Sequence, residues 1–302
     1  MNLIFLGTAG MLPTKERNVQ SIYLDLDSEG ILLDCGEGTQ RQMQLANLNF
    51  QKINKILISH WHGDHVAGLI GLLQTIGSFS DEQKTIKLFG PKNSKKYIEH
   101  MLKSCVFDSM VNLEITELNF EELTTFYENE DYFIQAINLE HSVPCVGFKF
   151  TTKSKRKILK EKLTQLNIKE GPHLAELQKG KAIVVAGQTI SADKLTKQTE
   201  QKSVSFIFDT KICEACYTLA ENSNYLVCEA VYAKDLEHKA EEYCHMTSNQ
   251  AAQVASASGV QKLILTHFSQ RYKTIEQLES DAKDVFPNTI CAYDLMKVKL
   301  NF

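Results

Sequence analysis

The sequence predicts an α/β fold, a sandwich of mixed β-sheets with helices packed against them. Short apolar runs with strand character alternate with segments of helical periodicity along nearly the whole chain. No repeat, low-complexity tract or Pro- and Gly-rich linker divides the 302 residues. We therefore expect a single domain over residues 1–302, long enough to bury a substantial core.

The first part of the chain begins with strands and tight turns. NLIFL is followed by SIYLDLD and ILLDCG, which a short turn at residues 28–30 joins as a hairpin. EGTQRQMQLANL has helical character, and KILIS is a short buried strand. The next segment, VAGLIGLLQTIGSF, predicts a helix with an apolar face made of Leu69, Leu72, Leu73 and Ile76.

The alternation continues to the end of the chain. The strand-like runs are IKLFGP, LEITEL, YFIQAINLEHS, VGFKF, SVSFIFDT, NYLVCEA, QKLILTH and NTICAYD. NSKKYIEHMLKS and SNQAAQVASASG are helical, and the small residues of the second suit close packing on a sheet. Residues 153–180 interrupt this pattern, with a short helix predicted at HLAELQKG.

Composition indicates an ordinary globular protein, with 43% hydrophobic residues and a net charge of -4. The first residues, MNLIFLGTAG, are apolar but short and lack a basic flank, so we expect no signal peptide, no membrane span and a cytoplasmic location. The eight cysteines lie mostly within apolar runs and indicate reduced thiols. We interpret the CEAC pair, Cys213 and Cys216, as ordinary helical positions.

Charge is distributed unevenly. Residues 153–163 hold six basic residues and one acidic residue, whereas residues 121–131 hold five acidic residues and no basic one. Composition alone favours the interpretation that the basic segment is a solvated face of the protein. The alternative interpretation is that it binds a polyanion.

Five strand-like runs lead directly to an ionisable side chain: His60, His141, Asp209, Glu229 and His267. In open α/β folds the loops that leave the strand ends build the active site, because the rigid sheet aims their side chains into one crevice. The sequence therefore predicts that these side chains converge.

The densest cluster is SHWHGDH. His60 and His62 are two positions apart, so in an extended segment their rings point the same way. Gly63 allows a sharp turn, and Asp64 and His65 begin the following helix. Imidazoles with a carboxylate and without a thiolate suit a catalytic Zn²⁺ better than a closed structural site.

These residues carry a resemblance. His60, His62, Asp64 and His65 form an HxHxDH motif similar to that of the metallo-β-lactamase superfamily. GTAGMLPTKERN, DCGEGTQ, FGPK and LTHFSQRY resemble, in the family's order and over nearly the whole chain, the short form of the ribonuclease Z family. The resemblance implies a four-layer αβ/βα sandwich and an endoribonuclease that removes the 3′ trailer from precursor tRNA, leaving a 3′-hydroxyl.

The resemblance also implies two Zn²⁺ per subunit, with Mn²⁺ as the alternative metal. The implied ligands are imidazoles and carboxylates: His60, His62 and His141 for one ion, Asp64, His65 and His267 for the other, and Asp209 as the bridge. Two such cations activate a shared water and stabilise both oxygens of a phosphodiester displacement. Asp64 is the family's candidate general base.

The chain departs from the family's pattern at one position. The family usually has His-Glu-Ala-Thr where this chain has Cys228, Glu229, Ala230 and Val231. The family histidine, which helps to protonate the departing 3′-oxygen, is thus replaced. The candidates for support of the leaving group or of the metal ligands are Cys228, Glu229 and His245. We expect Cys228→His to leave activity equal or higher.

Residues 153–180 resemble the flexible arm with which the family binds tRNA, inserted into the single domain. The candidates for RNA contact are basic or lie at the Gly-Pro tip: Lys153, Lys155, Arg156, Lys157, Gly171 and Pro172. Such contacts with phosphates position an RNA without reading its sequence. The resemblance further implies a homodimer in which the arm of one subunit serves the active site of the other.

Two other interpretations stay open. The first is a hydrolase of the same fold that acts on a small ester, thioester or cyclic phosphodiester, with an activity independent of the arm. The second is a catalytically weak tRNA-binding protein that keeps the metal scaffold, motivated by Cys228.

Overall fold

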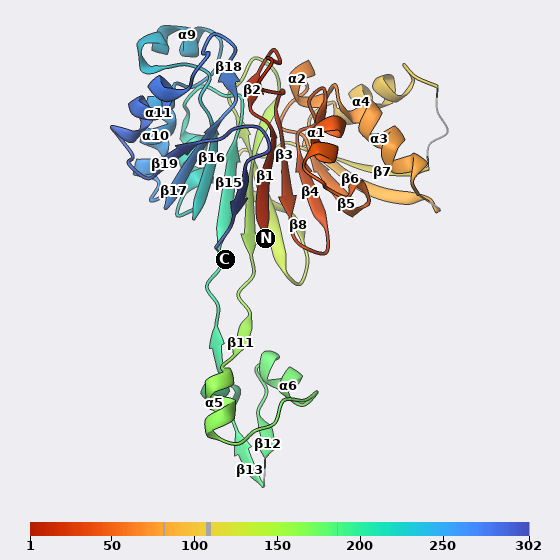
Figure 1. Ribbon diagram of the computed structural model, residues 1–302, viewed down its shortest axis with the longest axis vertical. Helices are drawn as coiled ribbons and strands as arrows, with labels where there is room; N and C mark the ends of the chain where they lie inside the picture. Colours follow the sequence, from red (N-terminus) through yellow and green to blue (C-terminus); the bar gives the residue numbers. More distant parts are fainter. Residues whose placement is uncertain (81, 107–109, 186, 302) are drawn as a thin grey trace. The chain divides into compact units, whose positions relative to one another are not determined.

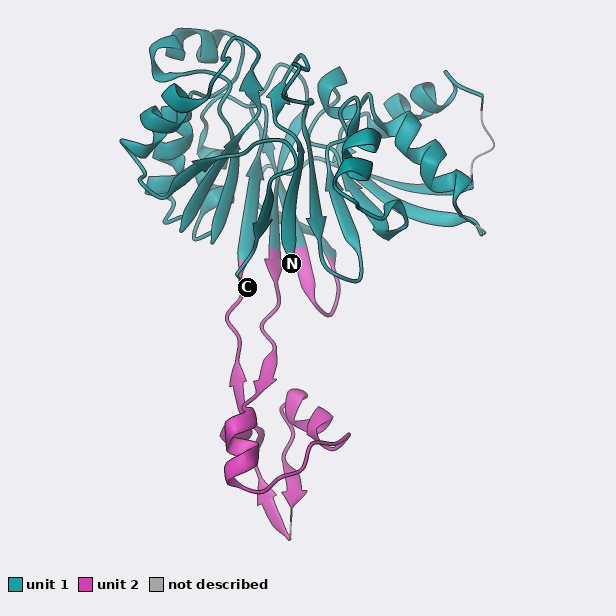
Figure 2. Cartoon of the chain, in the orientation of Figure 1, with its two compact units in different colours: residues 1–127, 134–150, 203–302 teal, residues 128–133, 151–202 magenta. Residues whose placement is uncertain are grey.

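A computed structural model describes residues 1–80, 82–106, 110–185 and 187–301. The chain forms two compact units, which Figure 2 shows in different colours. Unit 1 comprises residues 1–127, 134–150 and 203–302, and unit 2 comprises residues 128–133 and 151–202.

Two seven-stranded sheets make up the centre of unit 1 (Figure 1). The first has the strand order β20 (Lys297–Lys299), β1 (Asn2–Gly7), β3 (Ser21–Asp25), β4 (Gly30–Leu33), β5 (Ile53–Leu57), β6 (Lys84–Pro91) and β7 (Val111–Leu118). The second has the order β19 (Thr289–Cys291), β17 (Lys262–Thr266), β16 (Tyr225–Glu229), β15 (Ser203–Ile207), β10 (Cys145–Thr152), β9 (Tyr132–Leu139) and β8 (Thr124–Glu128). The rings of Phe89 on β6 and Phe126 on β8 lie 4.9 Å apart and join the two sheets.

Helices cover the outer face of each sheet. The first sheet carries α1 (Thr39–Leu45), η1 (Phe50–Lys52), α2 (Gly63–Val66), α3 (Leu69–Ser78) and α4 (Ser94–Leu102). The second carries α8 (Glu214–Ala220), η2 (Lys234–Leu236), α9 (Glu237–Glu242), α10 (Ser248–Ala257) and α11 (Glu276–Lys283). Figure 1 shows these two groups of helices on opposite sides of the strands, so the predicted αβ/βα sandwich is confirmed. The predicted apolar face of α3 is buried in the core with β4, β5 and β6.

Parallel pairing brings the strand ends together. β4, β5, β6 and β7 are parallel to one another, as are β15, β16, β17 and β19. In register, Leu33 pairs with Leu57, Ile207 with Cys228, and Glu229 with Thr266. Because the carboxyl ends of parallel strands meet at one edge of a sheet, the loops that follow these strands share that edge.

Two edge strands lie outside the strands predicted from the sequence. β8 falls within the acidic run 121–131, which charge alone marks as a solvated segment. Its aromatic residues explain the strand, because Phe126 packs against Phe89 and Phe148 while Lys55 and Lys87 lie over the Tyr127 ring. β20 pairs antiparallel with β1 through only three residues, too few to produce a period in the sequence.

Unit 2 folds around its own small apolar core. Its elements are β11 (Arg156–Ile158), α5 (Lys160–Gln165), α6 (Leu174–Gln178), β12 (Ile183–Val185), β13 (Gln188–Ile190), α7 (Ala192–Leu195) and β14 (Thr196–Gln198). The core contains leucines and isoleucines of the helices and strands, among them Leu163, Leu177 and Leu195. The unit extends beyond the expected 153–180 because Arg156 of β11 pairs with Gln198 of β14. Across the described part of the chain, no helix combines the length and the apolar character that a membrane span needs.

Candidate metal centre

The loop after β5 carries the first four candidate ligands. His60 and His62 precede α2, whose backbone begins at Gly63, and Asp64 and His65 lie within its single turn. His62 has extended backbone angles and His65 is wholly buried. The sharp turn expected at Gly63 therefore separates two histidines from an aspartate and a third histidine.

Three histidines and an aspartate form one group of possible metal ligands: His60, His62, His141 and Asp209. The His60 Nε2 and His62 Nδ1 atoms lie 3.0 Å apart, and the His141 Nε2 atom lies 3.3 Å from the same His62 nitrogen. The Asp209 Oδ2 atom faces this group at 3.7 Å from His60 Nε2 and 4.0 Å from His141 Nε2.

Asp64, His65 and His267 form a second group. The Nε2 atoms of His65 and His267 lie 3.1 Å apart, and each is 3.5 Å from Asp64 Oδ2. The Asp209 Oδ1 atom lies 3.3 Å from His65 Nε2 and 3.2 Å from His267 Nε2. Asp209 thus presents one carboxylate oxygen to each group.

The donor set of both groups fits a divalent metal. Four ligands about 2.0–2.1 Å from a tetrahedral Zn²⁺ lie roughly 3.3 Å from one another, close to the separations seen here. Within the described residues, the buried Asp209 Oδ1 atom accepts no well-directed hydrogen bond although two imidazole nitrogens are near it. Imidazole nitrogens and carboxylate oxygens that converge in this way are suited to share a cation.

Burial and neighbouring charges set the protonation states of three candidate ligands, Asp209, His60 and His65. Burial would raise the pKa of Asp209, but His267, His65 and His60 outweigh it and hold that pKa well below the usual range. Burial lowers the pKa of His60, and the charge of neighbouring His65 lowers it further. Asp209 is therefore a carboxylate and His60 a neutral imidazole, as ligands must be. Burial would lower the pKa of His65, but Asp209 and Asp34 outweigh it and raise that pKa well above the usual range, so metal binding must displace a proton from His65.

Asp34 and Ser59 orient the candidate ligand His65, and neither residue was predicted from the sequence. The Asp34 Oδ2 atom accepts a hydrogen bond of 2.7 Å from His65 Nδ1, while its Oδ1 atom accepts one of 2.7 Å from the Ser59 backbone. Such a carboxylate fixes the ring and the tautomer of a metal-binding histidine. The signal was present, because Asp34 directly follows the buried strand β4.

The GTAG segment forms a turn beside the centre. Its residues Ala9 and Gly10 form β2, which pairs with β18 (Phe268–Ser269) directly after His267. A Cβ atom at Gly10 would lie 2.7 Å from the His267 ring, so the ring requires glycine there. The backbone N–H of Met11 donates a 2.7 Å hydrogen bond to Asp64 Oδ2 and fixes that carboxylate.

Glu229 and His245 form a pair at the edge of the centre. Glu229 is wholly buried, and its Oε1 atom accepts hydrogen bonds from His245 Nδ1 at 3.2 Å and from the Thr210 backbone at 2.7 Å. Burial would lower the pKa of His245, but the Glu229 carboxylate overcomes this effect and raises that pKa to about 9. The His245 Nδ1 atom lies 4.0 Å from Asp209 Oδ2, so a protonated imidazole is held beside the candidate ligands.

Cys228 lies away from this pair. Successive residues of a strand face opposite sides, so while Glu229 faces the centre, Cys228 is wholly buried in the apolar core with Cys216, Leu219 and Ala251 under α8 and α10. The expectation that Cys228 supports the leaving group does not fit this placement, and neither does the expectation that histidine would be tolerated there.

The structure instead predicts that Cys228→His destabilises the fold. The larger imidazole would overpack the core and bury a polar ring without a partner, so we expect the free energy of unfolding to fall by about 1–3 kcal/mol. Urea denaturation measures this change. Cys105→His is the matched control, since Cys105 is exposed. Equal stability of the Cys228 variant and the wild type would contradict the placement.

The basic candidates lie in unit 2, where several already have acidic neighbours. Lys153 pairs with Glu128 at 2.5 Å, Lys155 pairs with Asp131, and Arg156 Nη1 lies 2.5 Å from Asp193 Oδ1. These pairs are partly or largely exposed, and exposed pairs contribute little stability, so a phosphate can displace the carboxylates.

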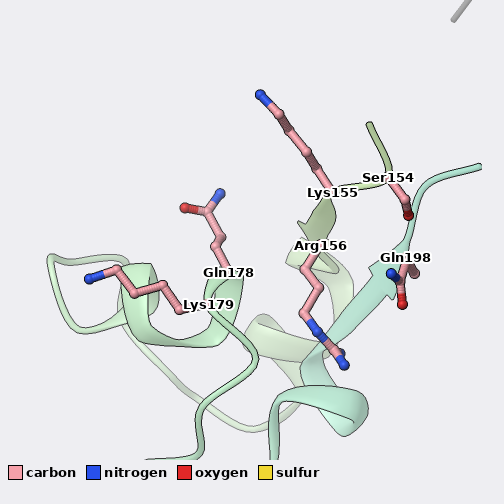
Figure 3. Close-up of a pocket in the computed structure, with 6 residues that line it drawn as sticks. All are labelled: Ser154, Lys155, Arg156, Gln178, Lys179 and Gln198. Atoms are coloured by element: carbon pink, nitrogen blue, oxygen red, sulfur yellow. The ribbon is translucent and has the colours of Figure 1, made fainter. Parts of the chain in front are cut away.

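A polar hollow of about 490 Å³ lies within unit 2. Its lining includes Arg156 and Gln198 from the paired strands β11 and β14, and Gln178 and Lys179 from the end of α6 (Figure 3). The predicted tip leads into α6, where the Gly171 and Pro172 carbonyls accept hydrogen bonds from the Leu174 and Ala175 backbones. Both residues therefore belong to a folded turn on unit 2.

The fold and the convergent histidines and aspartates define a metal-dependent hydrolase of the metallo-β-lactamase superfamily. Ribonuclease Z of Methanothermobacter thermautotrophicus is 36% identical over 99% of this chain and 97% of its own, and ribonuclease Z of Bacillus cereus is 37% identical over 98% of both chains. The crystal structure of human tRNase Z, short form, matches the whole of both chains with a TM-score of 0.73 at 23% identity. The chain belongs to the ribonuclease Z family, and its residues 1–158 also match the family described as anti-Pycsar protein Apyc1.

Proposed function

We propose that this protein is a metal-dependent endoribonuclease that removes the 3′ trailer from precursor tRNA. It would hydrolyse one phosphodiester bond and leave a 3′-hydroxyl on the tRNA. The observation that carries the proposal is the convergence of five histidines and two aspartates at the strand ends of a chain related to ribonuclease Z over its full length.

The metal in this proposal is zinc, two ions per subunit, with Mn²⁺ as the alternative. The proposed ligands are His60, His62 and His141 for one ion and Asp64, His65 and His267 for the other, with Asp209 shared. When bound, the two ions would activate a water and stabilise the charge on the phosphodiester oxygens.

Residues of the chain would move the protons. Hydrogen bonding to His267 and the charges of His65 and His267 outweigh the effect of burial and hold the pKa of Asp64 below its usual range. Asp64 therefore orients the attacking water and accepts its proton only as a weak base. His245, protonated at neutral pH through Glu229, is placed to donate a proton to the leaving 3′-oxygen.

Unit 2 has the charge that RNA binding requires. Residues 151–202 contain 12 Lys and Arg against 5 Asp and Glu, whereas the whole chain contains 33 against 37. Positive charge is thus concentrated in one segment while the rest of the chain is acidic. Contacts from this segment to the phosphates would position a tRNA without reading its sequence.

Replacing Lys153, Lys155, Arg156 and Lys157 with Ala should weaken tRNA binding selectively. We expect the Michaelis constant for precursor tRNA to rise, while hydrolysis of bis(4-nitrophenyl) phosphate is unchanged. The binding constant should also depend less steeply on salt. In a plot of its logarithm against the logarithm of the salt concentration, the slope should decrease in magnitude by about 0.9 for each phosphate that loses its contact with a lysine or arginine. Steady-state kinetics at several salt concentrations measure both effects.

The control replaces four exposed lysines outside unit 2 with Ala: Lys103, Lys283, Lys297 and Lys299. It removes the same charge from the protein, so it should change the Michaelis constant much less. Equal losses in the two variants, or an equal loss on the small substrate, would contradict a role of unit 2 in RNA binding.

The proposed function is tested by incubating the zinc-loaded protein with a 3′-extended precursor tRNA and mapping the cut. We expect cleavage just 3′ of the discriminator base, abolished in Asp64→Ala and in His62→Ala. An intact precursor with fully metal-loaded wild-type protein would overturn the proposal.

A second candidate is hydrolysis of a small phosphodiester by the same site. The match of residues 1–158 to the Apyc1 family favours it, because that stretch contains five of the seven candidate ligands and little of the basic segment 151–202. Activity on small phosphodiesters without cleavage of precursor tRNA would support this candidate. The third interpretation, a weak enzyme that only binds tRNA, loses its motivation because Cys228 lies in the core.

We also propose a homodimer, as the family resemblance implies, and a cytoplasmic location, as the first residues of the sequence indicate. Exposed apolar side chains lie just after α3, within α4 and beyond α4, at Phe79, Tyr97 and Val106, and contact with a second copy would cover them.

A further inference from the structure

Cys213 and Cys216 form a close thiol pair that the proposed mechanism does not use. Their Sγ atoms lie 3.6 Å apart, and the backbone N–H of Cys216 donates to the Cys213 carbonyl. Cys213 is the residue that precedes α8, and Cys216 lies in the first turn of that helix. A bond between these sulfurs needs a separation of about 2.05 Å, which a small shift of the Cys213 side chain would provide.

The two thiols differ in access and in acidity. Cys216 is wholly buried, whereas Cys213 is partly exposed and lines a cavity of about 420 Å³ together with Glu140, Lys211 and His245. The hydrogen bond from the Cys216 thiol lowers the pKa of the Cys213 thiol to about 6, and the same interaction raises the pKa of Cys216. An accessible thiolate beside a buried thiol is the arrangement of an attacking and a resolving cysteine.

The pair is joined to the metal centre through a short loop. Residues 209–213 connect Asp209 to Cys213, and within them the Thr210 backbone donates to Glu229 at 2.7 Å. The Lys211 backbone donates to the Glu140 carbonyl at 3.0 Å, and Glu140 directly precedes His141. A movement of Cys213 therefore pulls on the segments that carry Asp209, His141 and the partner of His245.

We propose that Cys213 and Cys216 are a reversible dithiol–disulfide site whose oxidation lowers the activity of the neighbouring metal centre. The oxidant is a low-molecular-weight disulfide. The Cys213 thiolate attacks one of its sulfurs and displaces the first thiolate, and Cys216 then attacks the Cys213 sulfur and displaces the second. The two cysteines lose two electrons and two protons, and the small disulfide is reduced to two thiols.

The test of the chemistry uses the metal-loaded full chain, equilibrated with fixed ratios of oxidised and reduced glutathione. After acid quenching and alkylation in denaturant, mass spectrometry follows the tryptic peptide 212–234, which contains Cys213, Cys216 and Cys228. In the wild type, we expect Cys213 and Cys216 to be neither alkylated nor bound to glutathione, because they form a disulfide with each other. In the Cys216→Ala variant, we expect one glutathione on Cys213. A peptide that stays fully alkylated, or a disulfide that includes Cys228, would overturn the inference.

The effect on activity rests on the proposed function and is measured on the same samples. We expect oxidation to lower kcat on precursor tRNA by about 10- to 100-fold, because small displacements of catalytic groups cost rate factors of this size. A phosphine reductant should restore kcat, and Cys213→Ser should remain active in the oxidising buffer. Equal inhibition of Cys213→Ser would refute the link to the centre. If the reduced wild type fails to cut precursor tRNA, the proposed function fails, while the peptide assay still decides the dithiol chemistry.

Discussion

Asp209→Ala is expected to remove bound metal and to abolish cleavage of precursor tRNA. The two oxygens of this carboxylate face the two histidine groups separately, at 3.2–3.3 Å for one group and 3.7–4.0 Å for the other. Without them, the group of His60, His62 and His141 would have no carboxylate, and the group of His65 and His267 would keep only that of Asp64. Metal content by inductively coupled plasma mass spectrometry and single-turnover cleavage measure the two losses, and we expect the rate to fall by at least about 10³-fold.

Two variants make this experiment specific. Asp209→Asn keeps the shape of the side chain and one oxygen acceptor, so we expect it to retain more metal than Asp209→Ala but less than the wild type. Asp284→Ala removes an exposed carboxylate at the end of α11 and should change neither quantity. Full metal content in Asp209→Ala would show that the carboxylate does not hold the ions.

The strand ends were the part of this centre that could be predicted from the sequence. An apolar run followed by a charged or imidazole side chain is unusual, and parallel pairing of β15, β16 and β17 places such residues at one edge. The same criterion, applied to ILLD, would also have found Asp34, which holds His65.

Other features depend on pairing that no local pattern reveals. The position of β16 between β15 and β17 is one of them, because a local pattern does not say which strands pair. The extent of unit 2 likewise depends on the pairing of Arg156 with Gln198, which are separated by the whole unit. Strand pairs of three residues, such as β11 with β14, are too short to show a period of two.

The second large effect is expected for His245→Ala. A histidine that protonates the leaving oxygen accelerates the reaction by about 10²- to 10⁴-fold, so kcat for precursor tRNA should fall within this range. The same variant should hydrolyse bis(4-nitrophenyl) phosphate almost as fast as the wild type, because nitrophenolate leaves without a proton. Comparison of kcat for the two substrates measures the effect. Metal content must remain at the wild-type level, since loss of metal would show that His245 acts as a ligand.

The pH dependence of kcat tests the assignment of His245 as the proton donor. His245 has a pKa raised to about 9, so it is protonated and able to donate below pH 9, and kcat for precursor tRNA should fall as the pH rises through 9. Glu229→Gln removes the carboxylate that raises this pKa while an amide oxygen can still accept from the Thr210 or Met246 backbone. The fall in kcat should then begin at a lower pH. If the pH dependence of kcat is the same in Glu229→Gln as in the wild type, another group supplies the proton. That conclusion would hold even if His245→Ala lowers the rate.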